Sequence, residues 1–387
     1  MSSKFLIVGS GFSGSVLAHE LAINCDCHID IWEERDHIAG NCHTSRDEET
    51  GIMVHRYGPH IFNTNKKEIW DYVNAITEFR PYLHRVKAVY NGNVYTLPIN
   101  LLTLNQFFNK TFTPGTAAQF LKTLGDNNIH EPKNFEEQAL SFIGEELYKA
   151  FFKGYTRKQW GCEPRQLPAS VLKRIPVRFN YDDNYHNTLF TGIPIYGYST
   201  LIEKLLHLPN VHVYLNRKYD NEEKEKLNEY DHIFYTGALD SFFKYEFGRL
   251  GYRTVTFKSS VHNGDFQGAA QINYCDEEVP FTRITEHKHF TPWENHKKTI
   301  IFKEFSNETG PDDTPYYPKR LKEDKFILHK YRQKANSLTN VSFLGRLATY
   351  RYMDMDAVID EAINFSKMYL SARFAKEKVP VFPNEEK

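Results

Sequence analysis

Three glycines near the start of the chain have the spacing of a phosphate-binding turn. Residues 4–8 predict a short buried strand that is apolar from Phe5 onward, and Gly9, Gly11 and Gly14 follow it in the pattern GxGxxG, ahead of an apolar stretch with helical spacing. The first glycine of such a motif makes a tight turn, the second lets backbone approach a pyrophosphate, and the third lets helix and strand pack closely. The free N–H groups of the helix N-terminus attract the phosphates.

An acidic residue follows at the distance that a dinucleotide site needs. Residues 28–32 predict a second strand that ends in Glu33, about 24 positions after Gly9. A carboxylate there accepts hydrogen bonds from a ribose, whereas the alternative is a solvated glutamate at a strand end. Gly40 soon afterwards is typical of FAD proteins of the amine-oxidase type, although Ala39 stands where these usually have another glycine. We therefore expect FAD.

Composition and charge fit a multidomain globular protein. The 387 residues suffice for roughly two to three domains, and the formal net charge is −1. No overall charge draws the chain to nucleic acid, and no apolar run approaches the roughly 18 residues that insertion into a membrane requires. The five cysteines include no CxxC pair, which argues against a disulfide framework or a metal site. We expect reduced thiols and a cytoplasmic protein.

Four motifs of unusual composition lie far apart in the chain. They are YGPHIF at residues 57–62, YTRKQWG at 155–161, FTRITE at 281–286 and GRLATYRYMDMD at 345–356. Taken together, in this order and spacing, they resemble the bacterial UDP-galactopyranose mutase family. The resemblance runs from about residue 4 to about residue 370, and GxGxxG adds little to it because many flavoproteins share that motif.

The resemblance implies an isomerase that interconverts UDP-galactopyranose and UDP-galactofuranose with no net redox change. The family uses FAD, which must be reduced. In the family mechanism, flavin N5 attacks the anomeric carbon and displaces UDP, a flavin–galactose iminium opens the ring, and the sugar recloses through another hydroxyl before UDP returns. The implied substrate is therefore UDP-galactose in both ring forms, and such proteins are often homodimers.

The resemblance also implies roles for single residues. Arg174 and Arg283 would stabilise negative charge on the UDP pyrophosphate, since an arginine fork stays charged and donates two hydrogen bonds. The alternative for either one is a solvated surface residue. His60, in the YGPHIF turn, would contact the flavin near N5. Substrate binding would fall to Phe151, Tyr155, Thr156, Trp160, Tyr185, Asn273, Tyr317 and Tyr352, with Tyr316 left open as the alternative to Tyr317.

The implied cofactor site extends well beyond the glycine turn. Arg346 would meet the FAD pyrophosphate, and a helix starting within residues 352–356 would point its positive end at the isoalloxazine. The full set is Gly9, Gly11, Phe12, Ser13, Gly14, Glu33, Glu34, Arg35, Gly40, Asn41, His60, Ile61, Arg346, Met353, Asp354 and Met355.

We expect an α/β fold with three parts. A Rossmann-like FAD-binding domain would take residues 1–74, 193–239 and 341–387. An inserted helical domain would take residues 101–175, including a mobile substrate loop around Arg174. An antiparallel β-sheet domain would take residues 75–100 and 240–340, with a hairpin predicted at Asn91–Gly92. The active site is expected where the three parts meet.

Two other functions fit parts of the pattern. A flavin oxidase or dehydrogenase of the amine-oxidase type shares the expected fold, but its substrates need no pyrophosphate cage, so the arginine pair and Trp160 argue against it. A nucleotide-sensing protein that keeps FAD as a scaffold would bind UDP-sugar without turnover, yet it need not gather all these groups. Tolerance for other sugars and the source of electrons stay open.

Overall fold

The glycine motif lies beside the central strand of a parallel sheet. The computed structural model describes residues 2–169, 177–220 and 227–383. Its five-stranded sheet has the order β10-β2-β1-β11-β17, and every pairing is parallel. The last four residues of strand β1, Phe5 to Val8, are apolar and buried, because helices cover both faces of such a sheet. The strands are β1 (Ser3–Val8), β2 (Cys27–Trp32), β10 (Val211–Tyr214), β11 (His232–Tyr235) and β17 (Val341–Phe343).

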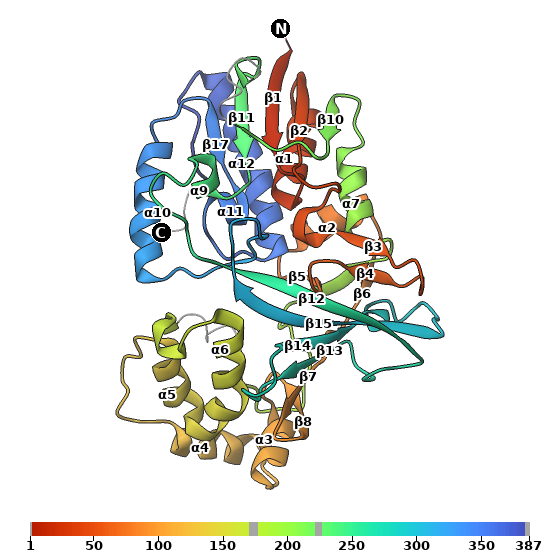
Figure 1. Ribbon diagram of the computed structural model, residues 1–387, viewed down its shortest axis with the longest axis vertical. Coiled ribbons are helices and arrows are strands. Elements are labelled where there is room, and N and C mark those ends of the chain that lie inside the picture. The colour runs from red at the N-terminus through yellow and green to blue at the C-terminus, as the bar shows by residue number, and fades with distance from the viewer. Residues whose placement is uncertain (1, 170–176, 221–226, 384–387) are drawn as a thin grey trace.

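Helix α1 (Phe12–Asn24) begins directly after the glycine turn, slightly earlier than its apolar spacing predicts. It packs against α7 (Gly197–Leu206) and against the long C-terminal helix α12 (Met355–Ala375). Gly14 permits this close start, because a Cβ there would overlap the carbonyl oxygen of Gly9. The C-terminal chain thus returns to the first turn of the molecule, as Figure 1 shows for α1 and α12.

A seven-stranded sheet crosses the middle of the molecule, where the long strands β12 (Tyr252–Asn263) and β15 (Lys298–Glu308) run side by side (Figure 1). Its order is β16-β12-β15-β14-β13-β7-β8. The hairpin predicted at Asn91–Gly92 is confirmed, since β7 and β8 pair across those two residues. The other strands are β7 (Val86–Tyr90), β8 (Asn93–Leu97), β13 (Gln271–Tyr274), β14 (Arg283–Glu286) and β16 (Tyr317–Pro318).

Two details of this region differ from the prediction of an antiparallel sheet over residues 75–100 and 240–340. The pairing of β13 with β7 is parallel, because the two strands come from distant segments and no hairpin fixes their direction. Residues 322–335 form the helix α10 (Lys322–Ala335). Its buried residues Tyr331 and Ala335 are four apart, which is helical spacing.

Short strands and helices connect the two large sheets. The segments β5, β9 and β6 form a small antiparallel sheet, and β3 pairs with β4. They bring the turn around His60 between the parallel sheet and the seven-stranded sheet. The elements are β3 (Thr44–Arg46), β4 (Met53–His55), β5 (Phe62–Thr64), α2 (Lys67–Ile76), β6 (Phe79–Pro81), β9 (Phe190–Pro194), α9 (Leu239–Phe242) and α11 (Gly345–Ala348).

Four helices form the opposite end of the molecule (Figure 1). Asn100 and Thr113 cap the first two helices through their side chains, and Asn134 caps the third. A wide π-helical turn over Tyr148–Lys153 joins the third helix to the fourth. The helices are α3 (Leu101–Phe108), α4 (Pro114–Leu124), α5 (Phe135–Leu147) and α6 (Gly154–Trp160).

The α/β class with a Rossmann-like sheet is therefore confirmed. The exact division into three domains stays a prediction. Throughout the described ranges, no helix is both long enough and apolar enough to cross a lipid bilayer.

Candidate active site

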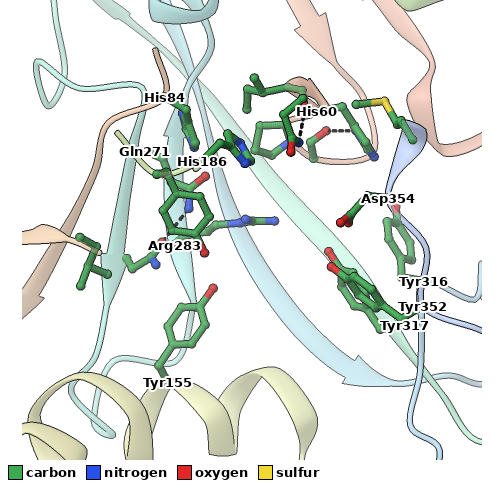
Figure 2. Close-up of a pocket in the computed structure, with 18 of the residues that line it drawn as sticks. His60, His84, Tyr155, His186, Gln271, Arg283, Tyr316, Tyr317, Tyr352 and Asp354 are labelled. Atoms are coloured by element: carbon green, nitrogen blue, oxygen red, sulfur yellow. Dashed lines mark hydrogen bonds between the residues drawn. The ribbon is translucent and has the colours of Figure 1, made fainter. Parts of the chain in front are cut away.

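A cavity of about 330 Å³ opens between the two large sheets and helix α6. The turn 57–61, helix α6, strands β13 and β14, and residues 352–355 contribute to its walls (Figure 2). Residues that the sequence places in one site therefore come together from segments more than 200 positions apart. They are Asn41, His60, Ile61, Phe151, Tyr155, Thr156, Trp160, Tyr185, Asn273, Arg283, Tyr317, Arg346, Tyr352, Met353, Asp354 and Met355.

The remaining predicted cofactor residues surround the turn at the end of β1 rather than lining this cavity. A Cβ on Gly11 would meet nothing within 4 Å, so the turn leaves room for a ligand at that point. Gly9 has a positive φ of 99° and packs against Thr236. These features fit a pyrophosphate at the start of α1. The set comprises Gly9, Gly11, Phe12, Ser13, Gly14, Glu33, Glu34, Arg35 and Gly40.

Glu33 lies at the end of β2 with a carboxylate that is only partly used. It accepts hydrogen bonds from the N–H and hydroxyl of Ser10, at 2.9 and 2.7 Å, and from the N–H of Arg35 at 3.0 Å. The residue is 5% exposed. A carboxylate has about four lone-pair sites, so one site remains for a ribose hydroxyl. Exposed Glu34, in contrast, points its side chain to solvent.

We predict that Glu33→Ala weakens FAD binding about ten- to hundredfold, because a hydrogen bond to a charged group contributes about 1.5–3 kcal/mol. Titration of apoprotein with FAD, followed by flavin fluorescence, measures this effect. Exposed Asp36 provides the matched control, and Asp36→Asn should leave the affinity within about twofold. Equal affinities in both variants would contradict the role of Glu33.

Basic side chains reach the cofactor region from two directions. Arg35 donates to Asn41 at 2.8 Å and lies over the ring of Tyr57 at 4.5 Å, while its buried Nη1 has no partner among the residues that the structure describes. From the C-terminal part, Gly345 approaches Ser13 so closely that a Cβ would overlap it. Arg346 therefore stands near the first turn. An orphaned guanidinium nitrogen beside an open glycine turn fits a diphosphate, as in FAD.

The turn that carries His60 is fixed through its main chain. The N–H of His60 donates to Nδ1 of buried His55 at 3.2 Å, and Tyr198 donates its hydroxyl to the carbonyl of His60 at 3.1 Å. Nδ1 of His60 lies 2.8 Å from the carbonyl of Gly58. Burial lowers the pKa of His60 to about 4 against the opposing effect of that carbonyl. The imidazole is thus neutral near pH 7, with Nδ1 donating to Gly58 and Nε2 as the acceptor.

Arg283 projects into the centre of the cavity from β14 (Figure 2). Its Nε and Nη2 contact one carboxylate oxygen of Glu304 at 2.7 and 2.6 Å. Glu304 is wholly buried, whereas the side chain of Arg283 is 17% exposed. Burial alone would lower the pKa of Arg283, but the carboxylate of Glu304 raises it above its ordinary value. The cavity therefore holds a permanent cation with a rigid anchor.

Aromatic side chains form the wall that faces Arg283. Tyr155 projects from α6 into the cavity, and Tyr317 and Tyr352 lie on the opposite side of the cavity from Tyr155 (Figure 2). The rings of Tyr317 and Tyr352 stack with centroids 6.1 Å apart, and Trp160 lies 6.4 Å from Tyr317. Burial raises the pKa of Tyr317 to about 12, so its hydroxyl stays protonated and can donate to a phosphate. Such a wall offers both stacking faces and hydroxyl donors.

Tyr316 and Tyr317 both line the cavity, but they face different neighbours. Tyr316 lies near Tyr57 at 6.3 Å, and its carbonyl accepts a hydrogen bond from Arg346. Tyr317 instead groups with Trp160 and Tyr352. This placement supports Tyr317 as the substrate-side tyrosine, with Tyr316 toward the cofactor residues.

One end of the cavity is lined by polar residues that the sequence analysis missed. His84 and His186 stack with centroids 6.0 Å apart, and Gln271 donates to Asn273 at 2.9 Å. Buried Nδ1 of His84 and Nε2 of His186 have no hydrogen-bond partner within the described ranges. Mainly through burial, the pKa of His84 falls to about 3 and that of His186 to about 4. These neutral rings therefore offer unused hydrogen-bonding capacity to a ligand.

One predicted residue and one group found in the structure lie outside this constellation. Arg174 and the substrate loop proposed around it lie outside the described residues. Asp265, Glu286 and His289 place possible metal-ligand atoms within 4.8 Å of one another on the seven-stranded sheet side. The ammonium of Lys288 lies 2.6 Å from Asp265, and Glu286 accepts hydrogen bonds from the N–H groups of Phe266 and Gln267, so both carboxylates already have partners.

Known proteins resemble the chain along nearly its whole length. Residues 150–352 match the UDP-galactopyranose mutase family, and residues 7–76 match the NAD(P)-binding Rossmann-like domain. A probable UDP-galactopyranose mutase of Klebsiella pneumoniae is 51% identical, covering 98% of both chains. A dTDP-fucopyranose mutase of Escherichia coli is 50% identical, covering 95% of this chain and 98% of its own. The crystal structure of a reduced UDP-galactopyranose mutase shares the fold, with a TM-score of 0.72, 13% identity and 99% of each chain covered.

Proposed function

The chain belongs to the UDP-galactopyranose mutase family, and from this premise we propose that it interconverts UDP-galactopyranose and UDP-galactofuranose on reduced FAD. One observation carries the proposal. A single cavity holds the flavin-side turn of His60, the anchored cation of Arg283 and the aromatic wall of Tyr155, Trp160 and Tyr317. A flavin oxidase needs the first of these features, but only a nucleotide-sugar enzyme needs all three.

Reduced FAD, when bound, supplies the nucleophile that displaces the nucleoside diphosphate from the sugar. The residues of the chain hold the reactants. Arg283 would stabilise the charge that develops on the departing diphosphate, because its position is fixed by Glu304 before the reaction starts. The hydroxyls of Tyr317 and Tyr352 would donate to the same phosphates. Trp160 would stack on the uracil, and such stacking contributes about 1–3 kcal/mol.

The sugar would lie toward the polar end of the cavity. His84, His186 and Gln271 offer buried hydrogen-bonding groups there. A site built to bond a hydroxyl rejects an analogue that lacks it much more strongly than an apolar pocket rejects one extra group. Galactose carries a hydroxyl at C6, whereas fucose is a 6-deoxy sugar. We therefore infer a preference for UDP-galactose over dTDP-fucose, although relatives of both specificities are almost equally similar to this chain.

The proposal extends to the redox state of the cofactor, the cellular location and the oligomeric state. We propose that the enzyme is active only with reduced FAD, works in the cytoplasm and forms a homodimer through its helical end. The half-exposed apolar side chains of Leu102 and Phe142 on that end support a protein partner there.

The decisive experiment incubates purified yellow protein with UDP-galactofuranose, with and without dithionite, and follows UDP-galactopyranose by chromatography. We expect conversion only after reduction, with kcat/KM at least tenfold higher than for dTDP-fucofuranose. Substrate-dependent flavin reduction with an oxidised product would support the oxidase instead. Tight binding of UDP-sugar without conversion in either redox state would support a nucleotide sensor. Faster turnover of the dTDP-sugar would reverse the assigned specificity.

A further inference from the structure

Lys158 makes an unusual set of contacts for a lysine beside a ligand cavity. It lies in α6 between Tyr155 and Trp160, but it points away from the cavity toward the turn that joins β13 to β14. Its ammonium lies within hydrogen-bond distance of four main-chain carbonyl oxygens, one more than its three N–H groups, so at least one N–H is shared between two carbonyls. They belong to Tyr274 at 2.7 Å, Asp276 at 2.8 Å, Val279 at 3.0 Å and Phe281 at 3.2 Å.

These carbonyls surround the ammonium in the way that oxygen ligands surround a monovalent cation. A salt bridge would place a carboxylate oxygen next to Nζ, whereas among the described residues the hydrogen-bond acceptors of Nζ are main-chain oxygens. The arrangement fixes the course of residues 274–281, because four of their peptide groups must point at one atom. The lysine thus adds to the packing of buried Cys275 and of Phe281, whose ring centroid lies 4.7 Å from that of Tyr274.

Other contacts attach the same helix to the same sheet. Gly154, at the start of α6, approaches the carbonyl of Cys275 so closely that a Cβ would overlap it. At the other end of the helix, Arg253 and Ser306 donate to the carbonyl of Gln159 at 3.1 and 2.6 Å. These contacts attach both ends of α6 to the sheet, and Lys158 attaches the helix to the turn between β13 and β14.

The two elements that Lys158 connects are the two sides of the cavity. Helix α6 carries Tyr155 and Trp160, and the strands on either side of the turn carry Asn273 and Arg283, which are paired neighbours across β13 and β14. We propose that Lys158 is a positioning residue, which sets the separation between the α6 side chains Tyr155 and Trp160 and the Asn273–Arg283 pair and so sets the affinity for the nucleoside diphosphate. This inference rests on the proposed nucleotide site.

Chemical rescue provides the test. In Lys158→Ala holoenzyme, we expect the Kd for UDP, measured by calorimetry, to rise at least tenfold while the flavin spectrum remains unchanged. Ammonium or methylammonium ions, added as chlorides, should bind among the four carbonyl oxygens that Lys158 leaves vacant. They should restore at least a fifth of the lost affinity for UDP. Tetramethylammonium chloride at the same ionic strength should restore none of the affinity for UDP, because its cation is too large for this site and has no N–H group to donate.

Arg157→Ala is the matched control, because Arg157 lies on the same helix and contacts the same turn only through an exposed ion pair with Glu277 at 2.6 Å. The Kd of this variant for UDP should stay within about twofold of the wild-type value.

Lys158→Gln, which keeps two donors, should give a Kd between those of the wild type and the alanine variant. It replaces the alanine variant if that variant does not fold. An unchanged Kd in both Lys158 variants, or a loss that ammonium does not reverse, would overturn the inference. If wild-type protein does not bind UDP, the proposed nucleotide site itself is wrong.

Discussion

Replacing Arg283 with alanine is expected to lower kcat/KM for UDP-galactofuranose about 10²–10³-fold while FAD stays bound, since this is the usual cost of removing one preorganised charge-stabilising donor. The structure adds a second consequence. Glu304 is wholly buried and loses its partner at 2.6–2.7 Å. An uncompensated buried charge of this kind costs about 3–5 kcal/mol of folding stability. The single variant therefore loses both catalytic activity and folding stability. Steady-state kinetics measures the first loss, and urea unfolding measures the second.

A double variant separates the two effects. Arg283→Ala/Glu304→Gln has no buried charge at this point, so its urea midpoint should return most of the way to that of the wild type. Its kcat/KM should stay near that of the single variant, because the cation at the diphosphate is still missing. The surface pair Arg46–Glu294, with contacts of 2.6 and 2.7 Å, offers the control. Arg46→Ala should change neither quantity much. Recovery of kcat/KM together with stability would show that Arg283 only supports the fold.

The pairing of Arg283 with Glu304 illustrates what the sequence did and did not reveal. The FTRITE motif points to Arg283, but nothing local to it indicates a partner about 20 residues away. The antiparallel register of β14 and β15 places the two residues directly opposite each other. One signal was present. Glu304 follows the apolar run Ile300–Phe302 in the strand TIIFKEF, and a carboxylate in a buried strand nearly always has a partner.

The glycine turn and Glu33 were predictable for the opposite reason. Their spacing is set by one strand, one turn and one helix, so short-range sequence order fixes their geometry. His84 and His186, in contrast, meet only because β7, β13 and the segment before β9 come together in space, and each looks like an isolated histidine in the sequence. Helix α10 was not predicted, because the many charged residues in its sequence hide the apolar positions Ile327, Tyr331 and Ala335, which follow one another every four residues.

Acid is expected to destabilise this protein at pH values where most carboxylates still keep their charge. His55, His84, His232 and His287 are at most 3% exposed. Burial is the largest cause of a lowered pKa in each, to about 3 for His84, His232 and His287 and well below the ordinary value of 6.5 for His55. In the unfolded chain these groups titrate near 6.5.

The sign follows from which state binds more protons. Above pH 6.5 the four imidazoles are neutral in both states, so they add no pH dependence. Between pH 6.5 and about 4, His84, His232 and His287 are protonated mainly in the unfolded chain, and stability therefore falls as the pH falls. At pH 5 each of His84, His232 and His287 contributes a loss of about 2 kcal/mol, or about 6 kcal/mol for the three, and His55 acts in the same direction. Carboxylates with a lowered pKa, such as Glu286 at about 2, add their loss mainly at lower pH.

Urea unfolding of FAD-saturated protein at pH 7.5 and pH 5.0 measures the difference. His232 is the best single probe, because it lies in the parallel sheet beside Ser342, away from the cavity. His232→Gln should reduce the pH-dependent loss by about 2 kcal/mol, since glutamine does not titrate. Exposed His130 meets water in both states, and His130→Gln should leave the loss unchanged. If stability is the same at both pH values, or if the two variants behave alike, the buried histidines are not the acid-sensitive groups.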